Sequence, residues 1–226
     1  MNFTLQPVND DGLASAARPN LLPQRITPSR HTNPFATCWT RPGALTFSFH
    51  DSQSANKLIA QLAAQDWNGE ILGPHGSGKS TLLATLVPRI EATGRRITSF
   101  ELRNGQRRLP AAFWRSVDGN SSSEILMIID GYEQLGWFER LRLKRFCRRW
   151  RTGLLVTSHS RTGLPTLTEL LPDLDQIVEL ANALCEGSSS TIDRREIAAS
   201  HARHGSNVRE IFFDLYDRHE RARRRR

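Results

Sequence analysis

Short apolar runs recur along the middle of the chain, and their lengths are those of buried strands. They lie at residues 70–72, 96–102, 124–130 and 154–159. Segments with apolar residues three or four positions apart surround these runs and predict helices. The helices are expected at residues 54–65, 82–94, 137–150, 193–204 and 207–221. Gly153 is expected to stop the third of these helices, and residues 163–172 are expected to form a loop and a short helix. Strands that alternate with helices predict an α/β fold of three layers, in which helices cover both faces of a mainly parallel sheet.

A glycine-rich segment follows the first run and fits the pattern G-x-x-x-x-G-K-[ST] at every fixed position. It consists of Gly73, Pro74, His75, Gly76, Ser77, Gly78, Lys79, Ser80 and Thr81. Glycines let successive backbone amides curl around phosphate groups, and a helix that starts at the end of the loop directs its positive dipole at them. We expect Lys79 to reach the β and γ phosphates of ATP. The Ser80 hydroxyl is expected to bind Mg²⁺, with Thr81 as a weaker alternative.

The N-terminal segment, residues 1–40, has five prolines among polar residues and no apolar period that could form a core face. We expect it to be disordered or extended. Residues 33–39 depart from this pattern, because their two aromatic side chains need a surface to pack against. Residues 44–49 alternate apolar and polar positions and predict a strand. Core packing is the preferred role for Phe47 and Phe49, with stacking on a bound base as the alternative.

A second nucleotide signature is the apolar run that ends in Asp130. A buried parallel strand would carry this carboxylate to the carboxyl edge of the sheet, beside the phosphate loop. There it could hold Mg²⁺ directly or through water. Many buried strands end in aspartate, so the pattern gains its meaning from the loop upstream. Together the two motifs predict a site for ATP and Mg²⁺ at Ser80 and Asp130.

The strand after the acidic one ends in three polar residues, Thr157, Ser158 and His159. With one phosphate loop and one acidic strand before it, the chain resembles the additional-strand, catalytic-glutamate division of P-loop NTPases, which includes AAA+, RecA-type and ABC ATPases. The resemblance implies a three-layer P-loop fold in which this strand lies between the loop strand and the acidic strand, its tip sensing the γ-phosphate. Similarity to AAA+ proteins implies Thr157 or Ser158 as the sensor, and similarity to ABC ATPases implies His159. A capping role for His159 is the alternative.

The catalytic base departs from the family pattern. Members commonly carry a glutamate directly after the aspartate, but here Gly131 follows and Glu133 stands two positions further on. Glu133 could orient the attacking water, or it could begin the next helix, where a carboxylate complements the dipole. RecA-type ATPases carry their base at the tip of the neighbouring strand, which implies Glu101. The sequence leaves this choice open, with a preference for Glu133, and leaves open slow or absent hydrolysis.

The C-terminal residues 187–226 begin with a Gly/Ser linker and continue with the last two predicted helices. This pair resembles a truncated AAA+ lid, and residues 205–210 are similar to the lid segment that carries a nucleotide-contacting arginine. The resemblance implies this role for Arg209, with a solvated surface position as the alternative. The chain is therefore expected to divide into an N-terminal segment (1–40), a P-loop core (41–186) and a helical lid with a basic tail (187–226).

Length and charge limit the number of domains and the kinds of partner. The 226 residues suit one α/β domain with a small appendage, and the net charge of +8 is concentrated at 140–151 and 221–226. The first cluster lies on the helix expected at 137–150, which also carries Trp137, Leu141 and Phe146. The basic tail is expected to attract nucleic acid without specificity, with a plain solvated surface as the alternative.

The three cysteines, Cys38, Cys147 and Cys185, lie far apart without C-x-x-C spacing, which indicates neither a disulfide framework nor a zinc site and favours the cytoplasm. We also expect no secretion signal and no membrane-spanning segment, because no apolar run is long enough.

The sequence therefore predicts an ATP-binding protein, foremost an Mg²⁺-dependent ATPase that hydrolyses ATP to ADP and phosphate to drive a conformational or assembly cycle. A nucleotide-gated interaction module with little turnover is the alternative, and Gly131 favours it. A small-molecule kinase is a third option. Partners beyond ATP are expected to be a second copy or another protein, and one of the arginines could then serve a neighbouring subunit.

Overall fold

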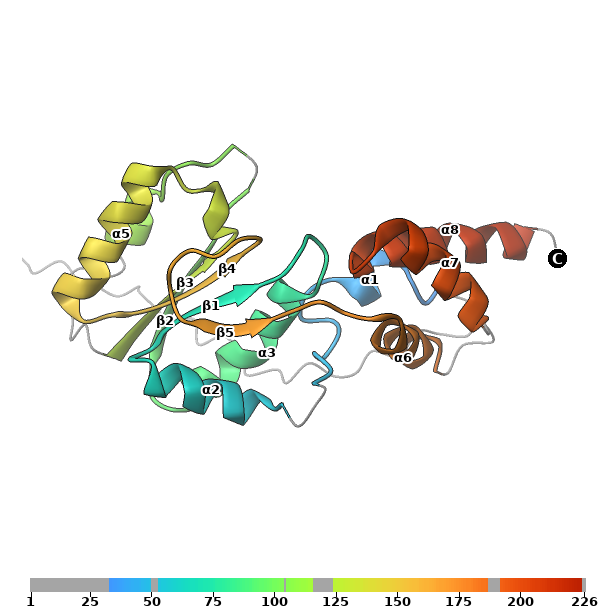
Figure 1. Ribbon diagram of the computed structural model, residues 1–226, viewed down its shortest axis with the longest axis horizontal. Helices are drawn as coiled ribbons and strands as arrows, with labels where there is room; N and C mark the ends of the chain where they lie inside the picture. The colour runs from blue at the N-terminus through green and yellow to red at the C-terminus, as the bar shows by residue number, and fades with distance from the viewer. Residues whose placement is uncertain (1–32, 50–52, 104, 116–123, 187–191, 225–226) are drawn as a thin grey trace, which may run out of the picture.

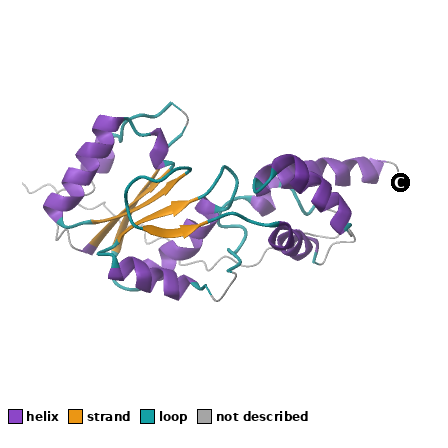
Figure 2. Cartoon of the chain, viewed as in Figure 1, coloured by secondary structure: helices purple, strands orange, loops and turns teal. Residues whose placement is uncertain are grey.

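A five-stranded sheet carries both nucleotide motifs, and Figures 1 and 2 show its arrangement. The computed structural model describes residues 33–49, 53–103, 105–115, 124–186 and 192–224. The strands are β1 (Asn68–Leu72), β2 (Arg96–Glu101), β3 (Ile125–Asp130), β4 (Gly153–Ser158) and β5 (Thr166–Glu169). Neighbouring strands are parallel, and their order is β2-β3-β4-β1-β5. Strand β4 therefore lies between the loop strand β1 and the acidic strand β3, which confirms the arrangement that the resemblance implies.

Helices cover both faces of the sheet because the side chains of its central strands alternate between two cores. The helices are α2 (Ala55–Ala64), α3 (Lys79–Glu91), α4 (Ala111–Arg115) and α5 (Trp137–Trp150). Leu126 and Ile128 of β3 pack with α2 and α3, whereas Met127 and Ile129 pack with α4 and α5. All four side chains are buried. The predicted three-layer α/β architecture with a parallel sheet is confirmed.

A smaller core lies beside the sheet, among the C-terminal helices that form a lid (Figure 1). These helices are α6 (Leu174–Cys185), α7 (Arg194–His204) and α8 (Val208–Arg224). Ile177, Ile197 and Ile211, one from each helix, are fully buried in this core. Helix α6 thus shares this core although it precedes residue 187, and the division of the chain at that residue stays a prediction. Two segments of the described chain join the lid region to the sheet, residues 170–173 before α6 and residues 41–46 after the short helix α1 (Thr37–Thr40).

Part of the N-terminal segment is ordered against the lid. Phe35 is fully buried in the lid core, and Trp39 packs at its edge, so the aromatic pair finds the surface that it needs. The Asn33 side-chain amide donates to the Tyr216 carbonyl (3.1 Å) and to the Glu220 carboxylate (2.9 Å) of α8. Residues 33–40 are therefore structured, in contrast to the expectation for 1–40. Residues 1–32, which fall under the same expectation, lie outside the described residues.

Three sequence predictions about secondary structure are wrong. Residues 44–49 form no strand, because the Phe47 amide donates to the Thr85 hydroxyl of α3 (3.3 Å) instead of to another backbone. Residues 166–169, expected in a loop and short helix, form β5, in which Leu167 is buried against α2 and α3. Helix α5 ends at the left-handed residue Arg151, so Gly153 begins β4 instead of stopping the helix.

Gly153 is required for another reason. A Cβ at this position would lie 2.6 Å from the Cβ of Trp67, so only glycine lets the start of β4 approach the residue before β1. The other predicted helices are present close to their expected bounds, and none of the helices in the described part of the chain is long and apolar enough to cross a membrane.

Candidate functional site

The phosphate loop connects β1 to α3 at the carboxyl edge of the sheet. Gly78 is the N-cap of α3 and adopts a left-handed conformation with φ of 97°. At Gly73 a Cβ would lie 2.6 Å from the Ser77 hydroxyl oxygen and 2.7 Å from the Leu170 carbonyl oxygen, so a larger residue cannot stand there. The loop thereby turns tightly and leaves the positive end of α3 directed at the cavity, as anion binding requires.

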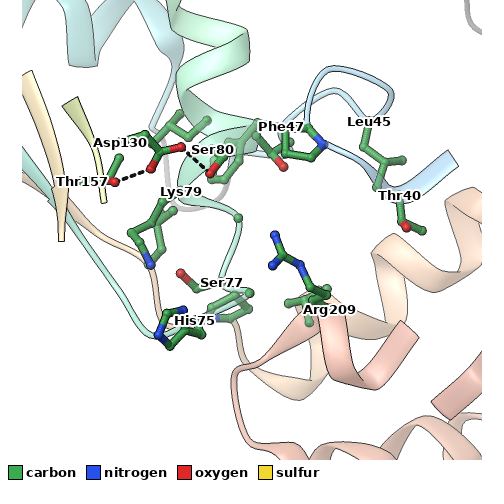
Figure 3. Close-up of a pocket in the computed structure, with 18 of the residues that line it drawn as sticks. Thr40, Leu45, Phe47, His75, Ser77, Lys79, Ser80, Asp130, Thr157 and Arg209 are labelled. Atoms are coloured by element: carbon green, nitrogen blue, oxygen red, sulfur yellow. Dashed lines mark hydrogen bonds between the residues drawn. The ribbon is translucent and has the colours of Figure 1, made fainter. Parts of the chain in front are cut away.

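Lys79, the first residue of α3, is buried and points back along the loop (Figure 3). Its ammonium donates to the carbonyl oxygens of Gly73 and Pro74, each at 2.7 Å. Burial lowers the pKa of Lys79, while the negative charges of Glu133 and Asp130 act in the opposite direction. Since both of these hydrogen-bond partners are neutral carbonyls, neither neutralises the positive charge of Lys79, which can attract a phosphate.

The Asp130 carboxylate accepts hydrogen bonds from two hydroxyl groups, one from the phosphate loop and one from β4 (Figure 3). The Ser80 hydroxyl donates to its Oδ2 at 2.7 Å, and the Thr157 hydroxyl of β4 donates to its Oδ1. The Gly131 amide in turn donates to the Thr157 hydroxyl oxygen at 2.9 Å. Thr157 therefore fixes the orientation of the acidic carboxylate, a contact that follows from β4 lying beside β3.

Ser80 and Asp130 offer oxygen ligands of the kind that Mg²⁺ prefers. In the described residues no group of three or more His, Cys, Asp or Glu side chains is placed to hold a metal ion. One hydroxyl and one carboxylate suit Mg²⁺ better than other metals, because this ion keeps several waters and shares phosphate oxygens. The residues at the loop thus fit the predicted metal.

Glu133 lies at the same cavity, carried there by the turn that Gly131 begins with φ of 80° and by the short 3-10 helix η2 (Tyr132–Gln134). Its carboxylate Oε1 is 2.9 Å from Nε2 of His159. Its Oε2 is buried and has no hydrogen-bond partner within the described structure. Arg140 of α5 donates to the backbone carbonyl of Glu133, which holds the turn from the other side. One carboxylate oxygen is therefore anchored and the other is available.

His159 follows β4 and links Glu133 to the loop. Its Nδ1 is 3.0 Å from the Gly73 carbonyl oxygen, the same oxygen that accepts from Lys79. The His75 ring lies against it, with ring centroids 3.7 Å apart. Burial, together with the charges of His159 and Lys79, lowers the pKa of His75. His75 is thus expected to be neutral near pH 7.

Glu101 and Ser158, the remaining candidates for the base and the sensor, are placed less favourably for contact with a nucleotide. Glu101 ends β2 directly opposite Asp130 and lines the cavity, but its side chain is exposed. Ser158 is fully buried and does not line the cavity, and its hydroxyl accepts from the Ser160 amide at 3.3 Å. Side chains alternate along a strand, so β4 presents Thr157 toward the cavity and turns Ser158 away. The geometry therefore favours Thr157 over Ser158 at the cavity, and the sensor role of Ser158 stays a prediction.

The lid contributes the residues at the start of α8. A Cβ at Gly76 would lie 2.0 Å from the Asn207 side-chain oxygen and 3.0 Å from the Arg209 Cβ, so the lid contacts the phosphate loop directly. Arg209 lines the cavity opposite Lys79, as Figure 3 shows. This is the location that its predicted role requires, and the role itself stays a prediction. Asn207 was not singled out from the sequence, which gives no signal of a contact between distant segments.

The cavity bounded by these groups has a volume of about 1090 Å³, which exceeds the range common for small-molecule sites. Besides the loop and Arg209, the end of α1 and the segment after it line the cavity with Thr40, Leu45 and Phe47 (Figure 3). Phe47 also packs on Phe49 and on the core around α3, so both roles considered for it are compatible with its position. The cavity thus has a polar end at the loop and a partly apolar end under the N-terminal segment.

Comparison with known proteins supports the fold. No protein-family model matches the chain, and no curated protein matches it either. A crystal structure described as a DNA replication initiation factor is similar over 80% of this chain and 67% of that chain, with a TM-score of 0.50 and 14% identity. AMPPCP-bound DnaA from Aquifex aeolicus is similar over 77% of this chain and 68% of that chain, with a TM-score of 0.46 and 16% identity. With the strand order, the first likeness supports a three-layer α/β fold of the P-loop kind.

Proposed function

We propose that the chain is an Mg²⁺-dependent ATPase that binds ATP between the core and the lid and hydrolyses it to ADP and phosphate. The observation that carries the proposal is the Glu133 carboxylate, which has one oxygen anchored on His159 and the other buried without a partner. It faces the same cavity as Lys79 and Asp130. An anchored carboxylate with an available oxygen is what positioning a water molecule requires. The cysteine pattern favours the cytoplasm as the setting.

The residues divide the work of phosphoryl transfer. The loop amides and Lys79 bind the β and γ phosphates, and Ser80 and Asp130 would hold Mg²⁺, which neutralises phosphate charge when bound. Glu133 Oε2 accepts a hydrogen bond from water, whose oxygen attacks the γ-phosphorus while the bond to the ADP oxygen breaks. The proton of the water passes to the carboxylate and then to solvent. Arg209 stabilises the negative charge on the transferred group from the lid side.

The partly apolar end of the cavity suits the base. Leu45 and Phe47 offer apolar surface there, and Val208 and Phe212 of α8 line the same cavity. A base bound between the N-terminal segment and α8 would contact both parts of the molecule. Nucleotide binding would then stabilise one position of the lid relative to the loop.

A nucleotide-gated module with little turnover is the second candidate. Gly131 occupies the position directly after Asp130, so no carboxylate stands where the family commonly places one. In this case the same cavity binds ATP, and the lid contact at Gly76 transmits the binding to a partner. An oligomer or protein partner belongs to either candidate and stays a prediction.

Phosphate release from ATP with Mg²⁺ distinguishes the candidates. Lys79→Ala is expected to abolish turnover and to weaken ATP binding. Glu133→Gln is expected to bind ATP normally and to reduce turnover by roughly 100-fold or more, as for loss of a general base. Glu101→Gln, a matched change at the cavity edge, is expected to stay within about threefold of wild type.

The neighbouring pair on β4 supplies a second control. Thr157→Val removes the hydroxyl that orients Asp130 and is expected to reduce turnover about tenfold or more, whereas Ser158→Ala should have little effect. Tight ATP binding by the wild type without any cleavage would contradict the ATPase and favour the gated module. Loss of turnover in Glu101→Gln but not in Glu133→Gln would assign the base to Glu101.

A further inference from the structure

Helix α5 carries aromatic side chains that are unusually exposed. Trp137 and Phe138 at its start are 68% and 79% exposed, and their rings contact one another with centroids 4.7 Å apart. Leu141, one turn later, and Trp150, at the other end, are each 46% exposed. The helix packs on the sheet through Glu139, Leu143 and Cys147 instead. Large apolar side chains gathered on an outer face commonly mark a binding surface.

The same face is strongly basic. Arg142, Arg145, Arg148 and Arg149 are exposed along α5. The one acidic residue of the helix, Glu139, is buried, where its carboxylate accepts from the Leu109 amide at 3.3 Å and lies 3.8 Å from Arg142. The outer face of α5 therefore presents positive charge with no exposed carboxylate of its own. Figure 1 places this helix on the outside of the sheet, at the end of the molecule away from the lid.

We propose that this face binds single-stranded nucleic acid. We call it the α5 surface and define it by Trp137, Phe138, Leu141, Arg145, Arg148 and Arg149. Arginines bind phosphates by releasing counterions, and flat aromatic rings stack on unpaired bases. A duplex hides the faces of its bases, so the exposed rings select a single strand. The helix is about 21 Å long, which suits a short site of roughly four nucleotides or slightly more.

Other occupants fit the α5 surface less well. A second copy docked through a two-fold axis would bring the same arginines together, and like charges oppose such an interface. An acidic protein would satisfy the arginines, but it would leave stacking unused at Trp137 and Phe138, whose rings are the most exposed large apolar groups of the described chain. The proposal does not rest on ATP hydrolysis. It also differs from the expectation for the basic tail, because it assigns binding to an ordered helix.

Fluorescence anisotropy of the full chain with a labelled oligothymidylate of about 20 nucleotides tests the proposal. The wild type is expected to bind it more tightly than a duplex of the same length. Trp137→Ala with Phe138→Ala should weaken binding by roughly tenfold or more, because each stacked base contributes about 1–3 kcal/mol. Arg145→Gln with Arg148→Gln should lower the slope of log affinity against log salt by about 0.7 for each lost contact.

Matched controls separate the α5 surface from other basic or aromatic positions. Phe213→Ala removes an aromatic ring of the lid that is 43% exposed, and it should leave binding unchanged. Arg221→Gln with Arg223→Gln and Arg224→Gln reduces the charge of the last turns of α8, and it should weaken binding less than the α5 changes do. Circular dichroism and ATP affinity confirm that each variant is folded.

Four results would overturn the proposal. They are an absence of binding, equal affinity for duplex and single strand, loss of binding only in the α8 variant, and unchanged binding in both α5 variants. Light scattering adds a fifth. If the wild type is a dimer and the Trp137/Phe138 variant is a monomer, the α5 surface serves a second copy instead.

Discussion

Phe35 is expected to fasten the N-terminal segment to the lid, and Phe35→Ala tests this directly. The side chain is fully buried, and its ring centroid lies 5.7 Å from that of Phe212 in α8. Truncating a buried phenylalanine to alanine costs about 3–5 kcal/mol where the surroundings stay in place. The segment can instead detach while the sheet stays folded. The lost stability should therefore appear as local opening of residues 33–40. A destabilisation of about 3 kcal/mol raises the population of the open state by roughly 100-fold.

This opening can be measured by hydrogen exchange and mass spectrometry, on peptides that cover residues 33–40. Phe35→Ala should speed their exchange by about two orders of magnitude and leave the β3 and β4 peptides unchanged. Phe213→Ala is the matched control. This residue of α8, next to Phe212, is 43% exposed, so losing its ring should cost less than about 1 kcal/mol. Phe35→Leu keeps most of the volume and should lie between the two. Equal exchange in Phe35→Ala and Phe213→Ala would refute the reasoning.

Three other outcomes are expected. Glu70→Gln should lower the free energy of unfolding in urea by about 2 kcal/mol, because the buried carboxylate accepts from one amide and two hydroxyls; an unchanged midpoint would contradict this. Gly76→Ala should weaken ATP binding by calorimetry about tenfold or more, since its Cβ would collide with Asn207, and Asn207→Gly in the same chain should restore part of the loss. Burial raises the pKa of Cys147 to about 11, so iodoacetamide at pH 8 should label exposed Cys38 and spare Cys147 until the chain is unfolded.

The loop and Asp130 were predictable because their chemistry depends on local spacing. Lys79 and Ser80 follow the glycines within one turn of helix, and Asp130 ends the strand that carries it. The strand order was predictable only through the resemblance, since periodicity does not say which strands are neighbours. The contact of Thr157 with Asp130 depends on that order, and the sequence could only offer three adjacent polar residues for it.

Contacts between segments that lie far apart in the chain could not be predicted from the sequence. Nothing in the residues around Gly76 indicates Asn207, and nothing in residues 44–49 indicates that the Phe47 amide would pair with a threonine hydroxyl. Apolar character was also misleading on α5. Trp137 is exposed while Glu139 is buried, because the Leu109 amide supplies a partner for that carboxylate. A hydrophobicity pattern cannot register a hydrogen bond from another part of the chain.

Two segments of the chain, residues 170–173 and 41–46, connect the lid to the sheet. Two connections limit how the lid can move relative to the sheet. A rigid body held at two separate points keeps one rotation, about the line that joins them. Movement of the lid as one body would then carry Arg209 along a single arc relative to the loop. Both connecting segments line the cavity, so a nucleotide bound there would lie close to this axis. Such a movement would return Arg209 to the same position at each closure, so its orientation would be largely set by the two connections before a nucleotide binds.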